Sequence, residues 1–539
     1  MNKIFKVIWS KSKQCYIVVS EIAKNKTGKK KIVVASILAA LAMQSGMITE
    51  VMAADPPSAR LADAAVAVGT NGVAIGSSAK SQSNQSVAIG YFSNAQAPSA
   101  SPENPATAVG AGANANGAGT VALGLSANAT GANAIALGGG SNGGTNKTEA
   151  TGKYAAAIGF NAKASQENAV ALGPSATAAA LNSIALGKGA SITAPTTGTT
   201  LGGQDSIAMG TGASAKQHSS VSVGLGASSD GVRSVAIGPK ASATDEDTIA
   251  IGTGGVGADK NNQVYGANGG GASTSVNGVS GVNLYYGAKS SGKQSIAIGY
   301  TANAKESGIA FGNYAVSDGG GGTAMGKSVL SRNGGIVVGQ SSNAIGKNSV
   351  AYGNTVKANG ENSTAMGYSS IADGQNAVAV GYSNSASNKD SVAIGNTNQS
   401  TNQGSVTVGY GNNATNDNAV AIGRSTNASG LLSTAIGNGA TSKGTYDVAI
   451  GSDVTANGNN SVAIGRNAKT SNTSSLAIGV YGTKGTSATG DYSIAMGRDV
   501  TASAESAIAI GKDAVSDKKN AVAIGSGSDT SSAATAQSS

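Results

Sequence analysis

Ser349-Val350-Ala351-Tyr352-Gly353 is repeated with small changes along the chain, as Ala377-Val378-Ala379-Val380-Gly381, Ser391-Val392-Ala393-Ile394-Gly395 and Ser461-Val462-Ala463-Ile464-Gly465. The closing glycine falls at positions 353, 367, 381, 395, 409, 423, 437, 451, 465 and 479, a step of 14 residues held over nine intervals. A fixed period of this kind indicates a repeat architecture, in which each unit stacks on the next.

Each repeat predicts one thin coil of two short strands. Val392 and Ile394 are two places apart and share one face of a strand, whereas Ala393 faces the other way. Because both faces are apolar, we expect both to be buried, as in parallel sheets. The closing glycine provides a tight bend, small residues three and five places later form a second strand, and a Gly or Asn at the seventh place makes the return corner.

A coil of 14 residues cannot enclose a core of its own. It needs neighbours above and below, and its second apolar face suggests further copies of the chain at its side. Glycines in this register run from Gly76 to Gly525 and define 29 rungs. At roughly 4.8 Å per rung, the stack is about 140 Å long. The fold class predicted is therefore an all-β parallel solenoid shaped as a rod.

The first 53 residues differ in kind from the rest. Met1 to Lys31 is basic, and an apolar run at 32–43 is too short for a membrane span. Val51-Met52-Ala53 offers the small residues that a signal peptidase reads, so we expect cleavage after Ala53. Cleavage removes nine Lys, two acidic residues and the only Cys, and lowers the formal charge from +9 to +2. The mature chain therefore has no disulfide, and its charge indicates no nucleic-acid partner.

The predicted layout is a signal peptide at 1–53, an initial segment at 54–75, rungs at 76–252, an insertion at 253–286, rungs at 287–525 and a low-complexity tail at 526–539. Longer steps before Gly110, Gly159 and Gly210 hold turn-forming residues and predict surface loops.

The first 21 residues, MNKIFKVIWSKSKQCYIVVSE, closely resemble the extended signal peptide of large Gram-negative autotransporters. Together with the 14-residue repeat, the chain resembles a trimeric autotransporter adhesin with a YadA-like head. The resemblance implies a left-handed parallel β-roll of three intertwined subunits, a homotrimer, exported to the cell surface and outer membrane of a Gram-negative bacterium. It also implies adhesion and virulence, with binding to collagen or another extracellular-matrix protein or cell-surface ligand.

Several motifs imitate catalytic or cofactor sites. Gly321 to Ser328 satisfies the phosphate-loop pattern and 252–257 satisfies the dinucleotide fingerprint, but neither is followed by a helical pattern. His218 is the only histidine and is most simply a solvated loop residue. The sequence therefore predicts no enzyme, no cofactor and no metal site.

Candidate ligand-binding residues are mainly tyrosines. Several directly follow a rung glycine and should lie on one line along the rod, where they either anchor a ligand or shield turn backbone. Three more lie in or at the end of the insertion, and the family's Asn-Ser-Val-Ala-Ile-Gly motif, tied to collagen binding by the resemblance, stands in full once at 460–465. The candidates are Tyr91, Tyr300, Tyr368, Tyr382, Tyr410, Tyr265, Tyr285, Tyr286, Asn460 and Ser461.

Two classes of function remain, a multivalent adhesin head and a structural spacer or shielding layer without a specific ligand. No heptad stalk and no run of amphipathic barrel strands follows the last rung. We therefore expect a fragment or a truncated product, linked to a membrane only through an anchor that this chain lacks.

Overall fold

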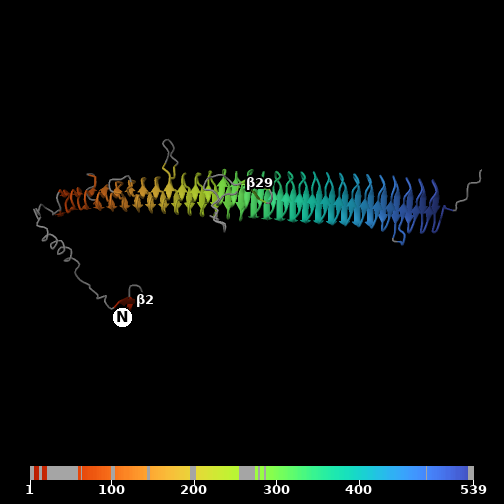
Figure 1. The fold of residues 1–539 in the computed structure, drawn as a ribbon, viewed down its shortest axis with the longest axis horizontal. Helices are drawn as coiled ribbons and strands as arrows, with labels where there is room; N and C mark the ends of the chain where they lie inside the picture. Colours follow the sequence, from red (N-terminus) through yellow and green to blue (C-terminus); the bar gives the residue numbers. More distant parts are fainter. Residues whose placement is uncertain are drawn as a thin grey trace, which may run out of the picture.

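The computed structural model describes residues 5–10, 15–20, 59–61, 64–98, 104–141, 146–194, 202–253, 273–276, 279–283, 287–480 and 482–531. These residues contain strands, turns and bends and no helix. Most of them form one straight rod of stacked turns (Figure 1). The prediction of an all-β parallel solenoid is confirmed.

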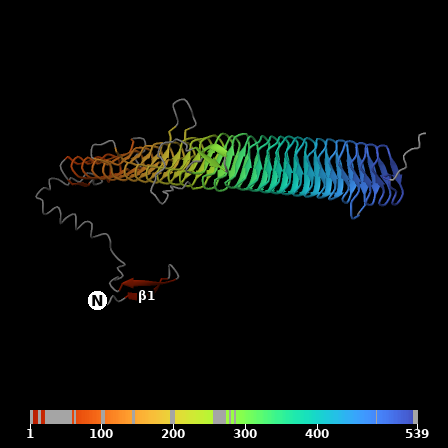
Figure 2. The same ribbon diagram turned by 45° about the vertical axis from the view of Figure 1, so that its right-hand side comes forward.

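Two long sheets, each made of parallel strands, run along the length of the rod (Figure 2). The first, here called the aliphatic sheet, contains 30 strands, which alternate along the chain with the 29 strands of the second, the polar sheet. Each inner strand pairs with the equivalent strand one turn before and one turn after it. For example, β43 (Val378–Tyr382) pairs with β45 (Val392–Asn396), and Ala379 lies opposite Ala393.

Strand length divides the rod into zones. Strands of the aliphatic sheet have three residues from β3 (Ala59–Leu61) to β33 (Ile309–Phe311). They have five residues from β35 (Thr323–Lys327) to β53 (Val448–Ser452), where pairing continues past the glycine. Later strands shorten again to three residues at β63 (Val522–Ile524), and polar-sheet strands such as β44 (Ser385–Ala386) have two or three throughout.

Alanine fills the core between the two sheets. Ala393 of the aliphatic sheet and Ala386 of the polar sheet are both 0 % exposed, whereas Val392 is half-buried and Ile394 is 38 % exposed. Inward side chains are small because the two sheets of one thin coil lie close together. The branched residues therefore face outward, and the second apolar face expected from the sequence is open on the single chain.

The period of glycines follows from the stacking. At Gly353, φ is 137°, and a Cβ would collide with the carbonyl oxygen of Gly367 in the next turn. At the other corner, a Cβ on Gly360 would meet the carbonyl oxygen of Gly374. Neighbouring turns thus approach too closely for a side chain at the first corner, whereas at the second corner some turns hold Asn, such as Asn388, in place of Gly.

Each turn also holds residues other than glycine in the left-handed region. Thr355 (φ 59°) follows the first corner and Asn362 (φ 55°) precedes the next strand. Asn, Asp and Ser dominate these positions because Asn and Asp tolerate this conformation best among residues with a side chain.

Strand pairing extends into the initial segment 54–75, because β3 pairs with β5 (Val73–Ile75). The insertion leaves the stack intact: β27 (Ile249–Ile251) pairs directly with β31 (Ile296–Ile298). Within it, β28 (Ser273–Val276) and β29 (Val279–Asn283) form an antiparallel hairpin. Near the N-terminus, β1 (Phe5–Ser10) pairs with β2 (Cys15–Ser20), also antiparallel.

Candidate functional site

Three of the candidate tyrosines lie on one line, as expected. Tyr368 and Tyr382 are opposite each other on neighbouring strands, and the line continues through Asn396 to Tyr410 and Arg424. The three tyrosines are between 47 % and 52 % exposed. They end the strands β41 (Thr364–Tyr368), β43 and β47 (Val406–Tyr410), so the rigid aliphatic sheet fixes their spacing.

The rings along this line interact with one another. Tyr368 and Tyr382 stack with their centroids 5.1 Å apart and an interplanar angle of 9°. The Arg424 guanidinium lies 5.9 Å from the centroid of the Tyr410 ring. We call Tyr368, Tyr382, Asn396, Tyr410 and Arg424 the tyrosine ladder. It offers a row of aromatic edges and one cation, a combination suited to a protein ligand.

Two further candidates follow rung glycines elsewhere on the rod. Tyr91 is 59 % exposed and meets Phe92 edge-on at 4.4 Å. Tyr300 is half-buried and meets Tyr314 edge-on at 5.3 Å, and burial together with the hydrogen bond to Tyr300 raises the pKa of Tyr314. Tyr265, Tyr285 and Tyr286 lie outside the described residues.

Asn460 and Ser461 have different surroundings. Asn460 is exposed at a corner with φ 57°, which gives the motif asparagine a conformational role. Ser461 is 0 % exposed, and both its backbone N–H and its hydroxyl donate to Asp447 Oδ1, at 2.9 and 2.8 Å. The Ser461 side chain therefore faces the core rather than the surface, and we assign it a structural role in place of the ligand contact expected from the motif.

Asp447 is a buried carboxylate that the sequence did not single out. It is 0 % exposed and occupies the place of a small polar residue in other rungs, such as Ser433. Its Oδ2 accepts from the Gly444 N–H at 2.7 Å. Together with the two bonds from Ser461, this gives both carboxylate oxygens a donor.

A ladder of buried asparagines, also missed, lies near the first corner. Asn384, Asn398 and Asn412 are at most 1 % exposed. The Asn398 side-chain N–H₂ donates to the Gly409 carbonyl at 2.8 Å, and its Oδ1 accepts from the Asn412 N–H at 2.9 Å. Asn384 and Asn412 make equivalent bonds one turn earlier and later. Each asparagine thus satisfies corner groups of the turn that follows it.

Exposed tyrosines also occur at places that the sequence analysis did not consider. Tyr446 and Tyr492 are 54 % and 59 % exposed in the left-handed corner position that Asn460 occupies in its own turn. Tyr352 is 56 % exposed on the outer face of the aliphatic sheet. The position of each tyrosine within its 14-residue repeat could have located them from the sequence.

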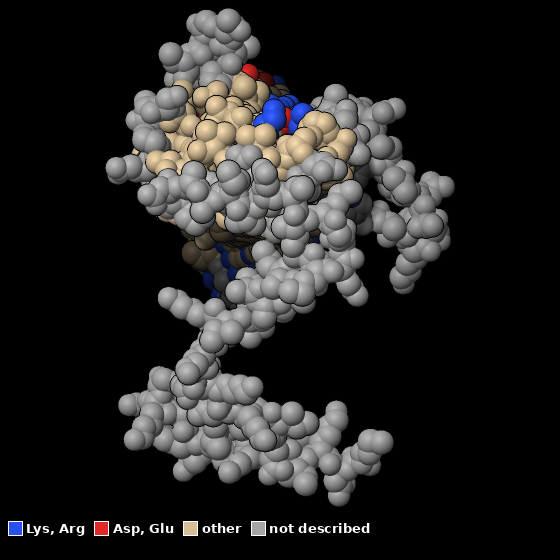
Figure 3. All heavy atoms as spheres, turned by 90° about the vertical axis from the view of Figure 1, so that its left-hand side faces the viewer, with Lys and Arg blue, Asp and Glu red and all other residues tan. Residues whose placement is uncertain are grey.

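Charged side chains form a cluster on three successive turns, the last two of which flank the insertion. Arg233 donates to Asp247 at 2.6 Å and to Glu246 at 2.7 Å, and Lys293 lies 3.0 Å from Glu246. The hydrogen bond from Lys293, followed by that from Arg233, lowers the pKa of Glu246, and the bond from Arg233 lowers the pKa of Asp247. All four side chains are exposed, so the cluster contributes little to stability. Viewed from the end of the rod, most of the visible described surface is formed by residues other than Lys, Arg, Asp and Glu (Figure 3).

Asp499 holds a short loop near the C-terminal end of the rod. Its side chain is 4 % exposed and accepts from the backbone N–H groups of Lys484, Gly485 and Thr483 at 2.6, 2.9 and 3.2 Å. These bonds, of which that from Lys484 has the largest effect, lower the pKa of Asp499. The carboxylate is thus a structural anchor for the loop.

His218 has one carboxylate nearby, since its Nε2 lies 3.8 Å from Asp205, and its Nδ1 contacts the Ser219 hydroxyl at 2.5 Å. These are the residue types of a hydrolytic triad. Ser219 and Asp205, however, are the left-handed corner residues of successive turns, with φ 55° each, and their place is that of Asn and Ser in other turns. We therefore interpret His218, Ser219 and Asp205 as polar residues at the corners of two successive turns.

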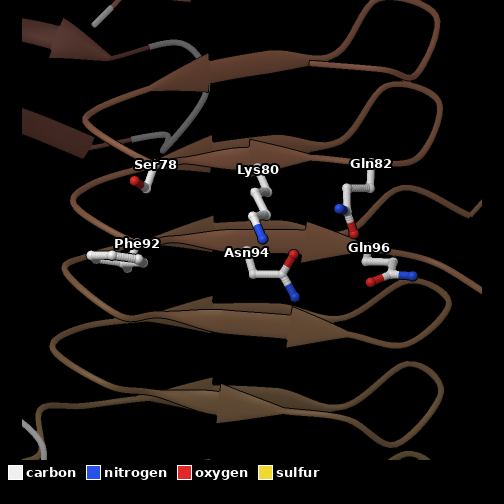
Figure 4. A pocket seen from close by; sticks show the side chains of 6 residues that line it. All are labelled: Ser78, Lys80, Gln82, Phe92, Asn94 and Gln96. Atoms are coloured by element: carbon white, nitrogen blue, oxygen red, sulfur yellow. The ribbon is translucent and has the colours of Figure 1, made fainter. Parts of the chain in front are cut away.

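A depression lies on the outer face of the polar sheet between β6 (Lys80–Ser81) and β8 (Asn94–Gln96), and its lining is mainly polar (Figure 4). The phosphate-loop pattern falls on β35, and β36 (Leu330–Arg332) follows it instead of a helix. Within the described ranges no group of three or more His, Cys, Asp or Glu could hold a metal ion. No described helix is long and apolar enough to cross a membrane.

Two protein-family models match the chain. Residues 1–47 match the "Extended Signal Peptide of Type V secretion system". The "YadA head domain repeat" matches, once overlaps are merged, residues 67–93, 105–141, 150–190, 202–227, 229–254, 286–308, 333–355, 358–426, 428–453, 456–481, 484–499 and 502–528. A search of curated proteins found no match.

The repeat matches cover more than half of the chain, and they follow the turns of the solenoid. Proteins of this family are typically not enzymes. The signal peptide and the repeats together indicate export and a cell-surface location in Gram-negative bacteria. The chain therefore belongs to the YadA head repeat family and is a trimeric autotransporter adhesin-like protein.

Proposed function

We propose that the rod is the head of an adhesin, assembled as a left-handed, intertwined parallel homotrimer, which attaches the cell to host extracellular matrix or to other cells through many weak, non-catalytic contacts. Two features support the proposal. One face of the rod leaves a long apolar stripe exposed on the single chain, and the remaining surface presents small polar and aromatic side chains many times.

The observation that carries the trimer is the chemistry of the aliphatic sheet. From β5 to β63, its two outward positions per strand hold 58 side chains, and none of them is charged. Val, Ile and Leu fill 47 of these positions, and members such as Ile394 (38 %) and Ile450 (37 %) are exposed on the single chain. A stripe about 140 Å long and about 7 Å wide covers roughly 1,000 Å². Monomers rarely expose apolar patches above roughly 300–600 Å², so a stripe of this size favours association.

The polar sheet has mostly half-buried or exposed outward side chains, and the exceptions, at most 1 % exposed, are Asn303, Val316, Leu330 and Asn343. Its outward positions hold mainly Ser, Thr, Asn and Lys, for example Asn413, Asn427 and Thr441. A trimer that buries the aliphatic face would therefore present the polar sheets and the corners to its surroundings. The corners carry the exposed candidates Tyr91 and Asn460.

The tyrosine ladder is the surface that we propose for ligand contact. Tyrosine supplies contact area at a low entropic cost, and Arg424 adds a cation. A trimer would present three such ladders on one rod. Linked weak sites raise avidity by about 10² to 10⁴ without a strong single contact. Collagen and other extracellular-matrix proteins are the ligand class that we propose.

A direct test is solid-phase binding of the purified chain to collagens, fibronectin, laminin and whole cells. We expect binding that falls severalfold, without being abolished, in a Tyr368→Ser, Tyr382→Ser double variant. The matched control is Tyr446→Ser, at an exposed corner outside the ladder. Absence of binding to every surface by a folded trimer would leave the structural spacer as the better function.

The trimer has its own test. Sedimentation should give three times the mass of one chain, and Ile464→Asp should disrupt the assembly, because it places one unpaired charge per copy in a dry interface at a cost of several kcal/mol. A folded monomer of the parent protein would sink the trimer, and an unchanged mass for Ile464→Asp would contradict the burial of this face.

A further inference from the structure

The near-uniformity of the aliphatic face raises a question of alignment. If 47 of 58 outward side chains are Val, Ile or Leu, a neighbouring copy shifted by one turn meets almost the same surface. Such a shift loses the contacts of only about one turn among 29. Weakly specified strand stacks are prone to slippage, so some feature must make the correct height preferable.

Departures from uniformity are concentrated in five consecutive turns. Phe311, Met325, Tyr352 and Met366 occupy the outward position before the glycine, where most other turns have Ile, Val or Leu. They are 51 %, 41 %, 56 % and 38 % exposed. The strand register places these side chains in one row, with the smaller Val338 between two pairs of larger residues. The order along the row is Phe311, Met325, Val338, Tyr352, Met366.

Tyr352 differs from the other three because it carries a hydroxyl. The residues beside it on the same face, Val338 and Met366 in the adjacent turns and Val350 in its own strand, have no hydrogen-bonding side chain. A tyrosine hydroxyl that is buried usually requires a partner. On this face, a copy aligned at the same height brings another Tyr352 hydroxyl to the same level, whereas a copy shifted by one turn brings Val338 or Met366.

We propose that Tyr352, supported by Phe311, Met325 and Met366, sets the register in which copies of this chain associate. This rests on the proposed trimer. Aligned copies pair the Tyr352 hydroxyls with one another and place side chains of equal size at each level. Shifted copies leave the hydroxyls unpaired and set a large ring against Val338, which leaves a void or forces overpacking. One polar residue in an apolar seam fixes alignment in coiled coils by the same principle.

Cysteine cross-linking can read the register, because Cys15 is the only native cysteine. In full-length chains carrying Cys15→Ser, Ile394→Cys is introduced into one chain and Val408→Cys into a second, differently tagged chain. The two positions face outward one turn apart. Aligned copies give disulfides between equal positions, whereas copies shifted by one turn give mixed 394–408 disulfides.

The decisive variant is Tyr352→Ile, which restores the commonest residue at this position and keeps the strand pattern of neighbouring turns. We expect the ratio of mixed to equal disulfides to rise at least tenfold over the parent. The control Ile450→Val, on the same face in a uniform turn, should leave the ratio unchanged. Tyr352→Phe separates the two contributions: a rise there assigns the effect to the hydroxyl, and a rise in Tyr352→Ile alone assigns it to ring size.

An unchanged ratio in Tyr352→Ile would overturn the proposal while leaving the trimer intact, since disulfides between equal positions would still form. A parent protein that is folded and monomeric by sedimentation, with no disulfide between chains, would instead refute the trimer and this proposal with it. The two failures are therefore distinguishable.

Discussion

Replacing Asn398 by alanine removes a side chain that satisfies two backbone groups of the next turn. The Gly409 carbonyl loses the amide donor at 2.8 Å, and the Asn412 N–H loses its acceptor at 2.9 Å. Asn398 is 0 % exposed, so water has no access to replace it without a rearrangement. A buried group left unpaired costs about 1–3 kcal/mol, so the Asn412 N–H alone predicts a loss of about that size per chain.

Urea denaturation of Asn398→Ala measures this loss, and amide hydrogen exchange locates it. The Asn412 N–H should exchange faster in the variant than in the parent, because its acceptor is gone. Asn427→Ala is the matched control, since Asn427 faces outward from the polar sheet and no hydrogen bond to its side-chain oxygen is found within the described residues. If Asn398→Ala costs no more than Asn427→Ala, the asparagine ladder does not stabilise the corners as described.

Three further predictions concern other parts of the rod. Gly353→Ala should lower the melting temperature by several degrees, because its Cβ meets the Gly367 carbonyl oxygen, whereas Gly189→Ala, whose Cβ meets nothing within 4 Å, should cost less despite its φ of 65°; equal melting temperatures would contradict the close approach. Because the pKa of Asp499 is lowered, its ionised form stabilises the fold at pH values above the ordinary aspartate pKa of 3.8, and this contribution is lost as pH falls through the lower pKa of the folded state. Asp499→Asn should therefore weaken the fall of unfolding free energy at acid pH. An unchanged pH dependence would contradict the anchoring role of Asp499. Tyr410→Phe should keep ligand binding and Arg424→Gln should reduce it, because only the second variant removes the cation of the tyrosine ladder; a titration against the bound matrix protein measures both, and equal binding would contradict a role for the cation.

The repeat was readable from the sequence because stacking constrains residue type directly. Glycine at 353 is required by the backbone of the next turn, and the thin core favours small inward residues such as Ala393. These constraints recur in each regular turn and therefore appear as a period. The outward apolar face was equally visible, since Val392 and Ile394 alternate with Ala393.

What the sequence did not yield depends on which neighbour a residue meets. Asn398 and Asn413 are both asparagines in the repeat, yet one is buried between two corners and the other faces outward. The motif did not indicate that the Ser461 hydroxyl donates to Asp447, one turn earlier in the register, because that bond depends on which residue the neighbouring turn supplies. The strand register places three of the five predicted tyrosines on one line, and their ring stacking and the place of Arg424 required coordinates.

The direct pairing of β27 with β31 has a mechanical consequence for a rod that is pulled along its axis. Strands lie across the rod, so tension along it is carried by the hydrogen bonds between successive turns. The strand before the insertion is hydrogen-bonded directly to the strand after it in both sheets, so the hydrogen-bond ladder is not interrupted there. Tension along the rod is therefore carried by these hydrogen bonds and not by the inserted residues. A ligand bound to the insertion would leave the hydrogen bonds between turns unchanged.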